Sequence, residues 1–147
     1  VLPIFVKSGT NIKNPIKSMP GHFQFSIDMI EDEINEIVDL GIKAILLFGI
    51  PDKKDATGSD SYSDFGIVQL AIKRIKSLAP DILIISDICF CQYTDHGHCG
   101  ILQNVGNIIT VDNDKTLELI AKQALSHAKA GQGSEGEGCP VSVRPIR

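Results

Sequence analysis

Residues 43–49 of the chain read Lys-Ala-Ile-Leu-Leu-Phe-Gly, an almost continuous apolar run that gives the clearest indication of the fold. A strand covered on both faces of a parallel sheet has this composition, whereas a strand with one solvated face alternates apolar and polar residues. Similar runs occur at Leu2 to Val6 and at Ile82-Leu-Ile-Ile85. The three runs predict three buried parallel strands.

Three other segments carry apolar residues at the spacing of one helical face. Their predicted core-facing residues are Ile27, Ile30, Ile34, Ile37 and Val38 in the first, Ile67, Leu70, Ala71, Ile75 and Leu78 in the second, and Leu117, Ile120, Ala121, Ala124 and Ala128 in the third. We expect Ser26 to cap the first helix at its start and Gly41 at its end, and Asp112 or Asn113 to cap the third.

The predicted order of elements is βαβαβα, which indicates an α/β fold. Two architectures have this order, a doubly wound sheet and part of a (β/α)8 barrel, and periodicity does not choose between them. Both place functional groups beyond the carboxyl ends of the strands. We expect loops at residues 9–21, which are rich in glycine, asparagine and proline, and between Cys89 and the third helix.

Composition argues against several functional classes. A net charge of −4 with scattered basic residues predicts no nucleic-acid or anionic-membrane partner. No apolar run approaches the roughly 20 residues that span a bilayer. The first residues, VLPIFVKSG, lack the pattern of a secretory signal, so we expect a cytoplasmic protein. Three of the four cysteines lie within eleven residues, which favours metal binding or redox chemistry over disulfides.

Those cysteines lie in residues 87–100, Asp-Ile-Cys-Phe-Cys-Gln-Tyr-Thr-Asp-His-Gly-His-Cys-Gly, directly after the third predicted strand. Cys89 and Cys91 are two residues apart, so an extended chain directs both to one side. Gly97 and Gly100 allow the loop to return Cys99 to the same point. Three thiolates fill three corners of a zinc tetrahedron and leave the fourth for water or substrate, as in catalytic sites.

Other interpretations of the cysteines have less support. A single cysteine is often only a small buried apolar residue, but three in one loop are not explained in this way. The C-x-C spacing differs from zinc-finger pairs, and no second pair follows. A redox pair is possible, although C-x-x-C is absent. Cys139 is isolated, and we assign it no role.

The sequence does not assign single roles to the histidines or to Asp87. We expect His96 to support the ligands indirectly or to be an ordinary loop residue, whereas His98 is as readily a ligand as not. His22 and His127 are predicted to be ordinary surface or partly buried histidines. Asp87, at the strand end, is either a catalytic or orienting carboxylate or a loop cap.

The loop DICFCQYTDHGHCG resembles the zinc loop of porphobilinogen synthase, also called 5-aminolevulinate dehydratase. Further segments are similar to this family as far as Gly131; they are Leu2-Pro-Ile-Phe-Val6, Ser18-Met-Pro-Gly21, Asp39-Leu-Gly-Ile42, Leu47-Phe-Gly-Ile-Pro51 and Ala124-Leu-Ser-His-Ala-Lys-Ala-Gly131.

The resemblance implies a (β/α)8 TIM barrel, of which the first three βα units are represented here. It implies condensation of two 5-aminolevulinate molecules to porphobilinogen in tetrapyrrole (haem) biosynthesis, and assembly into homo-octamers. By position, Cys89, Cys91 and Cys99 correspond to the catalytic zinc ligands and Asp87 to the active-site aspartate. Because all three thiols are kept, the chain resembles the zinc-dependent branch, with Zn²⁺ as cofactor.

The resemblance ends after Gly131, where the glycine-rich sequence Gln-Gly-Ser-Glu-Gly-Glu-Gly begins. We therefore expect a partial barrel in residues 1–131 and a divergent, disordered tail in residues 132–147, with no regular structure from Cys139 onward. The family's Schiff-base lysines lie in the half that is not represented, and Lys7, Lys43 and Lys122 match no family motif.

Three hypotheses follow from the sequence. The first is a porphobilinogen synthase chain altered or truncated at its C-terminus, which lacks activity alone if no other lysine substitutes. The second is a non-catalytic zinc-binding fragment that associates with full-length subunits. The third, with least support, is a thiol-based redox or metal-storage protein.

Overall fold

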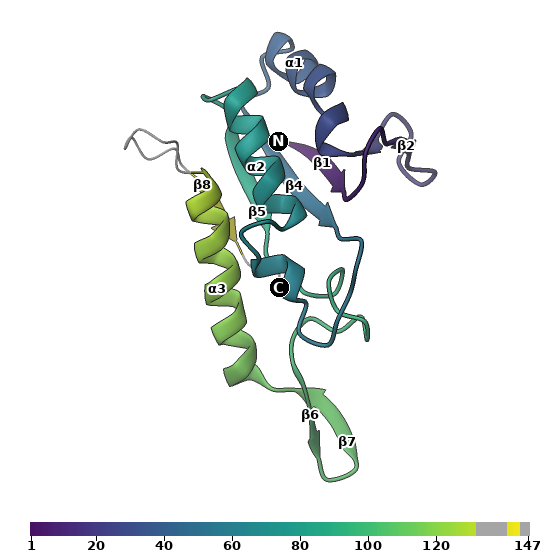
Figure 1. The fold of residues 1–147 in the computed structure, drawn as a ribbon, viewed down its shortest axis with the longest axis vertical. Coiled ribbons are helices and arrows are strands. Elements are labelled where there is room, and N and C mark those ends of the chain that lie inside the picture. Colours follow the sequence, from purple (N-terminus) through teal and green to yellow (C-terminus); the bar gives the residue numbers. More distant parts are fainter. Residues whose placement is uncertain (132–140, 145–147) are drawn as a thin grey trace.

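The three apolar runs form neighbouring parallel strands in a six-stranded mixed sheet (Figure 1). The computed structural model describes residues 1–131 and 141–144. Its strands and helices, in chain order, are β1 (Leu2–Lys7), β2 (Lys13–Pro15), β3 (Phe23–Phe25), η1 (Ile27–Met29), α1 (Glu31–Asp39), β4 (Ala44–Ile50), η2 (Ser59–Tyr62), α2 (Ile67–Leu78), β5 (Leu83–Asp87), β6 (Leu102–Val105), β7 (Ile108–Val111), α3 (Asn113–Gly131) and β8 (Val141–Arg144).

The sheet has the strand order β2-β3-β1-β4-β5-β8, and the predicted α/β class is confirmed. Strands β1, β4, β5 and β8 are parallel and lie side by side in chain order. The short strand β3 is also parallel to β1 and lies on the side away from β4, so the strand order alone does not choose between a doubly wound sheet and part of a barrel. In either architecture the parallel strands end at the same edge of the sheet. The carboxyl ends of β1, β4 and β5 therefore meet at one edge, where β5 continues into the cysteine loop.

The core lies between the sheet and its helices. Ile45, Leu47 and Ile84 are fully buried and pack with α2 residues such as Ile72 and Ile75. Because successive side chains of a strand alternate between the two faces, the opposite face carries a second apolar row. There the rings of β1 and β4 stack, with the centroids of Phe5 and Phe48 5.2 Å apart.

The first helix begins later than the sequence indicated. Residues 27–29 form a short 3-10 turn, and α1 starts at Glu31. The expected cap at Ser26 is wrong: its hydroxyl accepts a hydrogen bond from the Ile12 amide at 2.8 Å, so it fastens the preceding loop instead. The Gly41 cap is confirmed, since this glycine has φ +71° and its amide donates to the Val38 carbonyl.

Helix α3 only partly buries the face that its apolar residues predicted, since Ile120, Ala124 and Ala128 are half-buried. Leu117 is 60% exposed, and Ala121 is also exposed. The helix instead turns a mostly polar row inward, whose buried members are Thr116, Gln123, Ser126, His127, Ala130 and Gly131. The predicted cap is confirmed for Asp112, whose carboxylate accepts a hydrogen bond from the Lys115 amide at 3.1 Å.

Several short strands were not predicted. β2 and β3 lie in and after the expected loop at 9–21, and pair antiparallel beside β1. The hairpin β6–β7 lies within the long loop, and its signal was the Gly106-Asn107 pair between apolar residues. Strand β8 pairs with β5 in a segment to which the sequence analysis assigned no structure. The rest of the tail, residues 132–140 and 145–147, lies outside the described residues.

Within the described part of the chain, no helix combines the length and the apolar character needed to cross a membrane.

The burial of His127 predicts a pH-dependent stability. Burial lowers the pKa of this imidazole from 6.5 to about 4. The unfolded chain binds this proton more tightly than the folded chain does. The free energy of unfolding is therefore highest above pH 6.5 and falls progressively as the pH drops to 4. The difference corresponds to roughly 3 kcal/mol in the free energy of unfolding.

We expect urea unfolding of the wild type between pH 7 and pH 4 to show this loss, and His127→Gln to remove it. Asp87 and Asp60, whose carboxyl pKa values are raised by burial, act in the opposite direction and are common to both proteins. The difference between the two pH profiles therefore isolates His127. Parallel profiles would contradict the prediction.

Candidate metal centre

The cysteine loop is anchored by buried side chains that alternate with the cysteines. Phe90 and Tyr93 are almost fully buried beneath the loop, while Cys91 is exposed and Cys89 half-buried. Phe90 is buried at a bend that follows β5, and the cysteines on either side of it are more exposed. The Tyr93 and Thr94 amides both donate to the Phe90 carbonyl, which closes a tight turn through Cys91 and Gln92.

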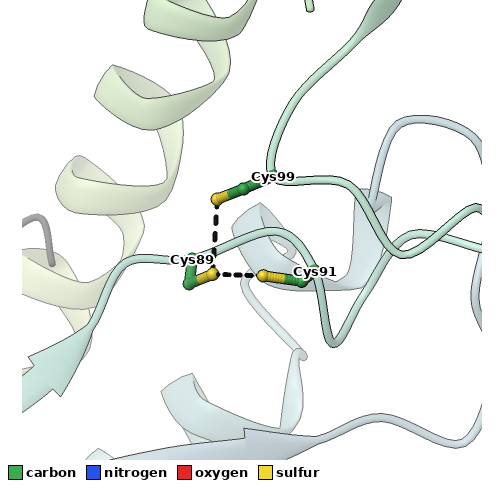
Figure 2. Close-up of side chains that lie close together, drawn as sticks. All are labelled: Cys89, Cys91 and Cys99. Carbon is green, nitrogen blue, oxygen red and sulfur yellow. Dashed lines mark hydrogen bonds between the residues drawn. The ribbon is translucent and has the colours of Figure 1, made fainter. Parts of the chain in front are cut away.

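The three predicted ligands converge on one point (Figure 2). The Sγ of Cys89 lies 2.7 Å from that of Cys91 and 3.3 Å from that of Cys99, and all three thiols are free. In the described residues, these three form the group whose ligand atoms lie within 4.8 Å of one another. A tetrahedral zinc with Zn–S bonds of about 2.3 Å needs sulfurs about 3.8 Å apart, so small side-chain rotations suffice.

The environment of the thiols fits a cation. Burial raises the pKa of the Cys89 thiol, and the neighbouring Cys91 and Cys99 raise it further. A thiol in this setting loses its proton only when a positive charge compensates, as a bound metal ion does. The Phe90 amide lies 3.2 Å from Cys99 Sγ and donates to it, which favours the thiolate. Because Cys91 and Cys99 are exposed, an ion can enter from solvent.

Asp87 ends β5 two residues before Cys89. Asp87 is only 5% exposed, and burial raises the pKa of its carboxyl group. Oδ2 accepts a hydrogen bond from the Gln92 side-chain amide at 3.3 Å, whereas Oδ1 is buried with no hydrogen-bond partner. A buried carboxylate oxygen without a partner is costly unless a ligand satisfies it. This favours a functional role for Asp87 over the alternative of a loop cap.

The structure places the two loop histidines away from the sulfur group. His96 Nε2 lies 3.3 Å from the Ala56 carbonyl, and its Nδ1 accepts from the His98 amide at 3.1 Å. The exposed His98 ring lies tilted beside that of His96, with centroids 5.7 Å apart. Neither imidazole belongs to the group of side chains whose ligand atoms lie within 4.8 Å of one another, which holds the three cysteines. His96 therefore stabilises the loop, in line with the expectation for that residue.

Sequence reasoning missed several residues that shape the site. Gln92 orients Asp87, and the Thr94 hydroxyl donates to the His98 carbonyl at 2.8 Å. His127, expected to be an ordinary histidine, is completely buried with its Nδ1 3.0 Å from Ser86 Oγ. The signal for Gln92 and Thr94 was their place between the cysteines. No sequence signal pairs Ser86 with His127, since 41 residues separate them.

Comparison with known proteins places this site in a family context. The family model described as "Delta-aminolevulinic acid dehydratase" matches residues 1–134. A delta-aminolevulinic acid dehydratase of Halalkalibacterium halodurans is 50% identical over 131 residues, which are 89% of this chain and 39% of that protein. One from Helicobacter pylori is 51% identical over 132 residues, covering 89% of this chain and 40% of that protein.

A solved structure has the same fold over most of the chain. The delta-aminolevulinic acid dehydratase (porphobilinogen synthase) of Toxoplasma gondii, in complex with the reaction product porphobilinogen, superimposes with a TM-score of 0.81 at 32% identity. The match covers 88% of this chain and 37% of that one. The chain thus spans about two fifths of the length of the relatives it matches.

Gly49 in β4 provides a test of how the loop is anchored. A Cβ at this position would collide with the Tyr93 hydroxyl and with Val68 Cγ2. We expect Gly49→Ala to lower the free energy of unfolding by about 1–3 kcal/mol, as overpacking does, because it displaces Tyr93 from beneath the cysteine loop. Urea denaturation measures this loss.

A double-mutant cycle supplies the control. Tyr93→Phe removes the hydroxyl that meets the new methyl group, so we expect it to relieve part of the cost of Gly49→Ala. Strictly additive effects of the two substitutions would mean that the collision with Tyr93 is not the cause.

Proposed function

Because the chain belongs to the delta-aminolevulinic acid dehydratase family, we propose that it serves the condensation of two 5-aminolevulinate molecules to porphobilinogen, a hydro-lyase reaction of tetrapyrrole biosynthesis. The observation that carries the proposal is the group of three thiols at the carboxyl end of β5. That edge of a parallel α/β sheet is where catalytic groups gather.

Cys89, Cys91 and Cys99 are the proposed ligands of Zn²⁺. When bound, zinc supplies a Lewis acid that polarises a substrate carbonyl or amine. Three thiolates rather than carboxylates favour zinc over magnesium, which takes oxygen ligands. The protein's contribution is to hold the three sulfurs together and to exclude water beneath them through Phe90 and Tyr93.

Asp87 is the proposed catalytic carboxylate. Gln92 fixes its orientation through Oδ2, which leaves Oδ1 to accept a hydrogen bond or a proton from a substrate amine. Its raised pKa increases its basicity and so its ability to take up a proton. The residue lies two positions before Cys89, so both groups act at the same strand end.

Three further proposals follow from family membership. The consecutive parallel strands β1, β4, β5 and β8 support an arc of a (β/α)8 barrel, with residues 1–131 as the family-like part. Homo-octameric assembly and a cytoplasmic location stay predictions. Sedimentation analysis of the purified protein tests the first, and cell fractionation tests the second.

Metal content tests the site directly. We expect one Zn²⁺ per chain under reducing conditions, and loss of most of it in Cys91→Ala because two thiolates cannot hold the ion as three do. Atomic absorption after gel filtration measures the stoichiometry. Cys139→Ala is the matched control, since this cysteine lies outside the loop, and it should keep the full zinc content. Equal zinc content in both variants would refute the assignment.

Product formation tests the reaction. We expect any porphobilinogen formed from 5-aminolevulinate, zinc and a reducing thiol to fall at least 100-fold in Asp87→Asn, since the amide cannot accept a proton. Borohydride trapping of a lysine adduct with 5-aminolevulinate locates the Schiff base. Zinc binding without product or adduct would favour the second hypothesis, a non-catalytic zinc-binding chain that associates with other subunits.

A further inference from the structure

Helix α3 contacts both ends of the cysteine loop with one face. The loop and the β6–β7 hairpin occupy the whole interval between β5 and α3, after which the helix runs back along the sheet (Figure 1). Thr116 and His127 are eleven residues apart on this helix. Eleven residues make three helical turns, so the two side chains lie on the same side, about 16 Å apart along the axis.

Thr116 holds the end of the loop that carries Cys99. Its Oγ1 accepts a hydrogen bond from the Ile101 amide at 3.0 Å and donates one to the Asp112 carbonyl at 2.6 Å. Gly100, between Cys99 and Ile101, has φ +143° and approaches so closely that a Cβ would lie 2.5 Å from the threonine hydroxyl. The position of Cys99 is therefore set against the first turn of α3.

His127 holds the end of the loop that carries Cys89. Its Nδ1 lies 3.0 Å from Ser86 Oγ, and both residues are completely buried. Ser86 faces the helices, so the neighbouring Asp87 faces the other side of the sheet. Burial keeps the imidazole neutral at physiological pH, since its pKa is lowered to about 4. The bond thus joins neutral groups next to the strand end.

We propose that Thr116 and His127 are positioning residues, through which one face of α3 fixes the distance between Cys99 and the Asp87–Cys89 segment. The inference rests on the proposed metal centre, because the segments that Thr116 and His127 position are those that carry its three thiols. Neither residue contacts the thiols or is a ligand. Each of them holds the backbone of a loop segment that carries a thiol.

The buried polar character of this face supports positioning over simple packing. A buried hydrogen-bonded pair contributes little net stability, and apolar residues of the same shape can replace it at nearly no cost. A polar pair, however, has one bonded geometry and so selects one arrangement of helix and strand. The bonds of Thr116 to Ile101 and of His127 to Ser86 therefore specify where the loop ends lie, whereas apolar side chains would only fill the space.

Cobalt binding provides the readout, since Co²⁺ replaces Zn²⁺ and its thiolate charge-transfer band reports how many sulfurs bind. We expect Thr116→Val and His127→Leu to weaken Co²⁺ binding by 10-fold or more and to reduce that band, as loss of supporting contacts does at metal sites. Thr116→Ser and His127→Gln keep a hydrogen-bonding group, and we expect both to bind within about threefold of wild type.

The matched control is Ser126→Ala. Ser126 is buried on the same helix, accepts a hydrogen bond from Gln69 of α2 at 2.8 Å and donates one to the Gln123 carbonyl at 2.9 Å, so its hydrogen bonds are to helix residues. It should perturb helix packing and leave the Co²⁺ spectrum unchanged. Thr116→Val and His127→Leu proteins that bind Co²⁺ as tightly as wild type would overturn the proposal, and so would an equal loss in Ser126→Ala.

Amide hydrogen exchange without metal separates this inference from the proposed function. We expect residues 88–101 to exchange at least 10-fold faster in Thr116→Val and His127→Leu than in Ser126→Ala. A wild type that binds no Co²⁺ would refute the metal centre, while this difference in exchange would still support positioning of the loop. Equal exchange in all three variants would overturn the positioning role.

Discussion

The alternation of side chains as the chain leaves β5 is the constraint on which the site depends. Ile88 and Phe90 are buried on one side of the backbone, which directs Cys89 and Cys91 to the other. The chain bends at Phe90 and turns through Cys91, and burial of the aromatic ring between the two thiols holds them in this arrangement. The later turn at Tyr93 and Thr94 then allows Cys99 to return.

Ionisation of the three converging thiols is unfavourable in the absence of a cation. Burial and neighbouring sulfurs both oppose ionisation of Cys89, so clustered thiolates repel one another. The rest of the fold maintains the cluster through packing, with Tyr93 seated against Gly49 of β4 and Phe90 against Gly58. Folding and metal binding are coupled in such a site, because the packed loop holds the ligand atoms together and the bound ion compensates the charge of the thiolates.

The polar inner face of α3 connects this site to the body of the domain. Helix–sheet contacts are usually apolar, and here the core between α2 and the sheet follows that pattern. Beside it, α3 packs Gln123, Ser126 and His127 inward. Of these, Ser126 bonds to Gln69 of α2, and His127 bonds to Ser86, next to Asp87 at the end of β5. The transition from apolar to polar packing thus coincides with the transition from core to functional edge.

The sequence alone determined the three apolar strands, the α/β order and the group of three cysteines, because each depends on local periodicity or on spacing within one loop. The apolar runs gave β1, β4 and β5, and the cysteine spacing gave the sulfur group that the structure brings together. The family resemblance, stated from the same loop, is confirmed by the family model.

Only the tertiary structure decided which face of α3 is buried, where Ser26 bonds, and how Ser86 meets His127. These contacts join residues far apart in the chain, and local pattern carries no information about such pairs. On α3 the apolar stripe predicted the buried face only in part, with Leu117 exposed and His127 buried. The reason is physical: periodicity reports which side chains avoid water, whereas hydrogen bonds across the fold determine which polar side chains can be buried.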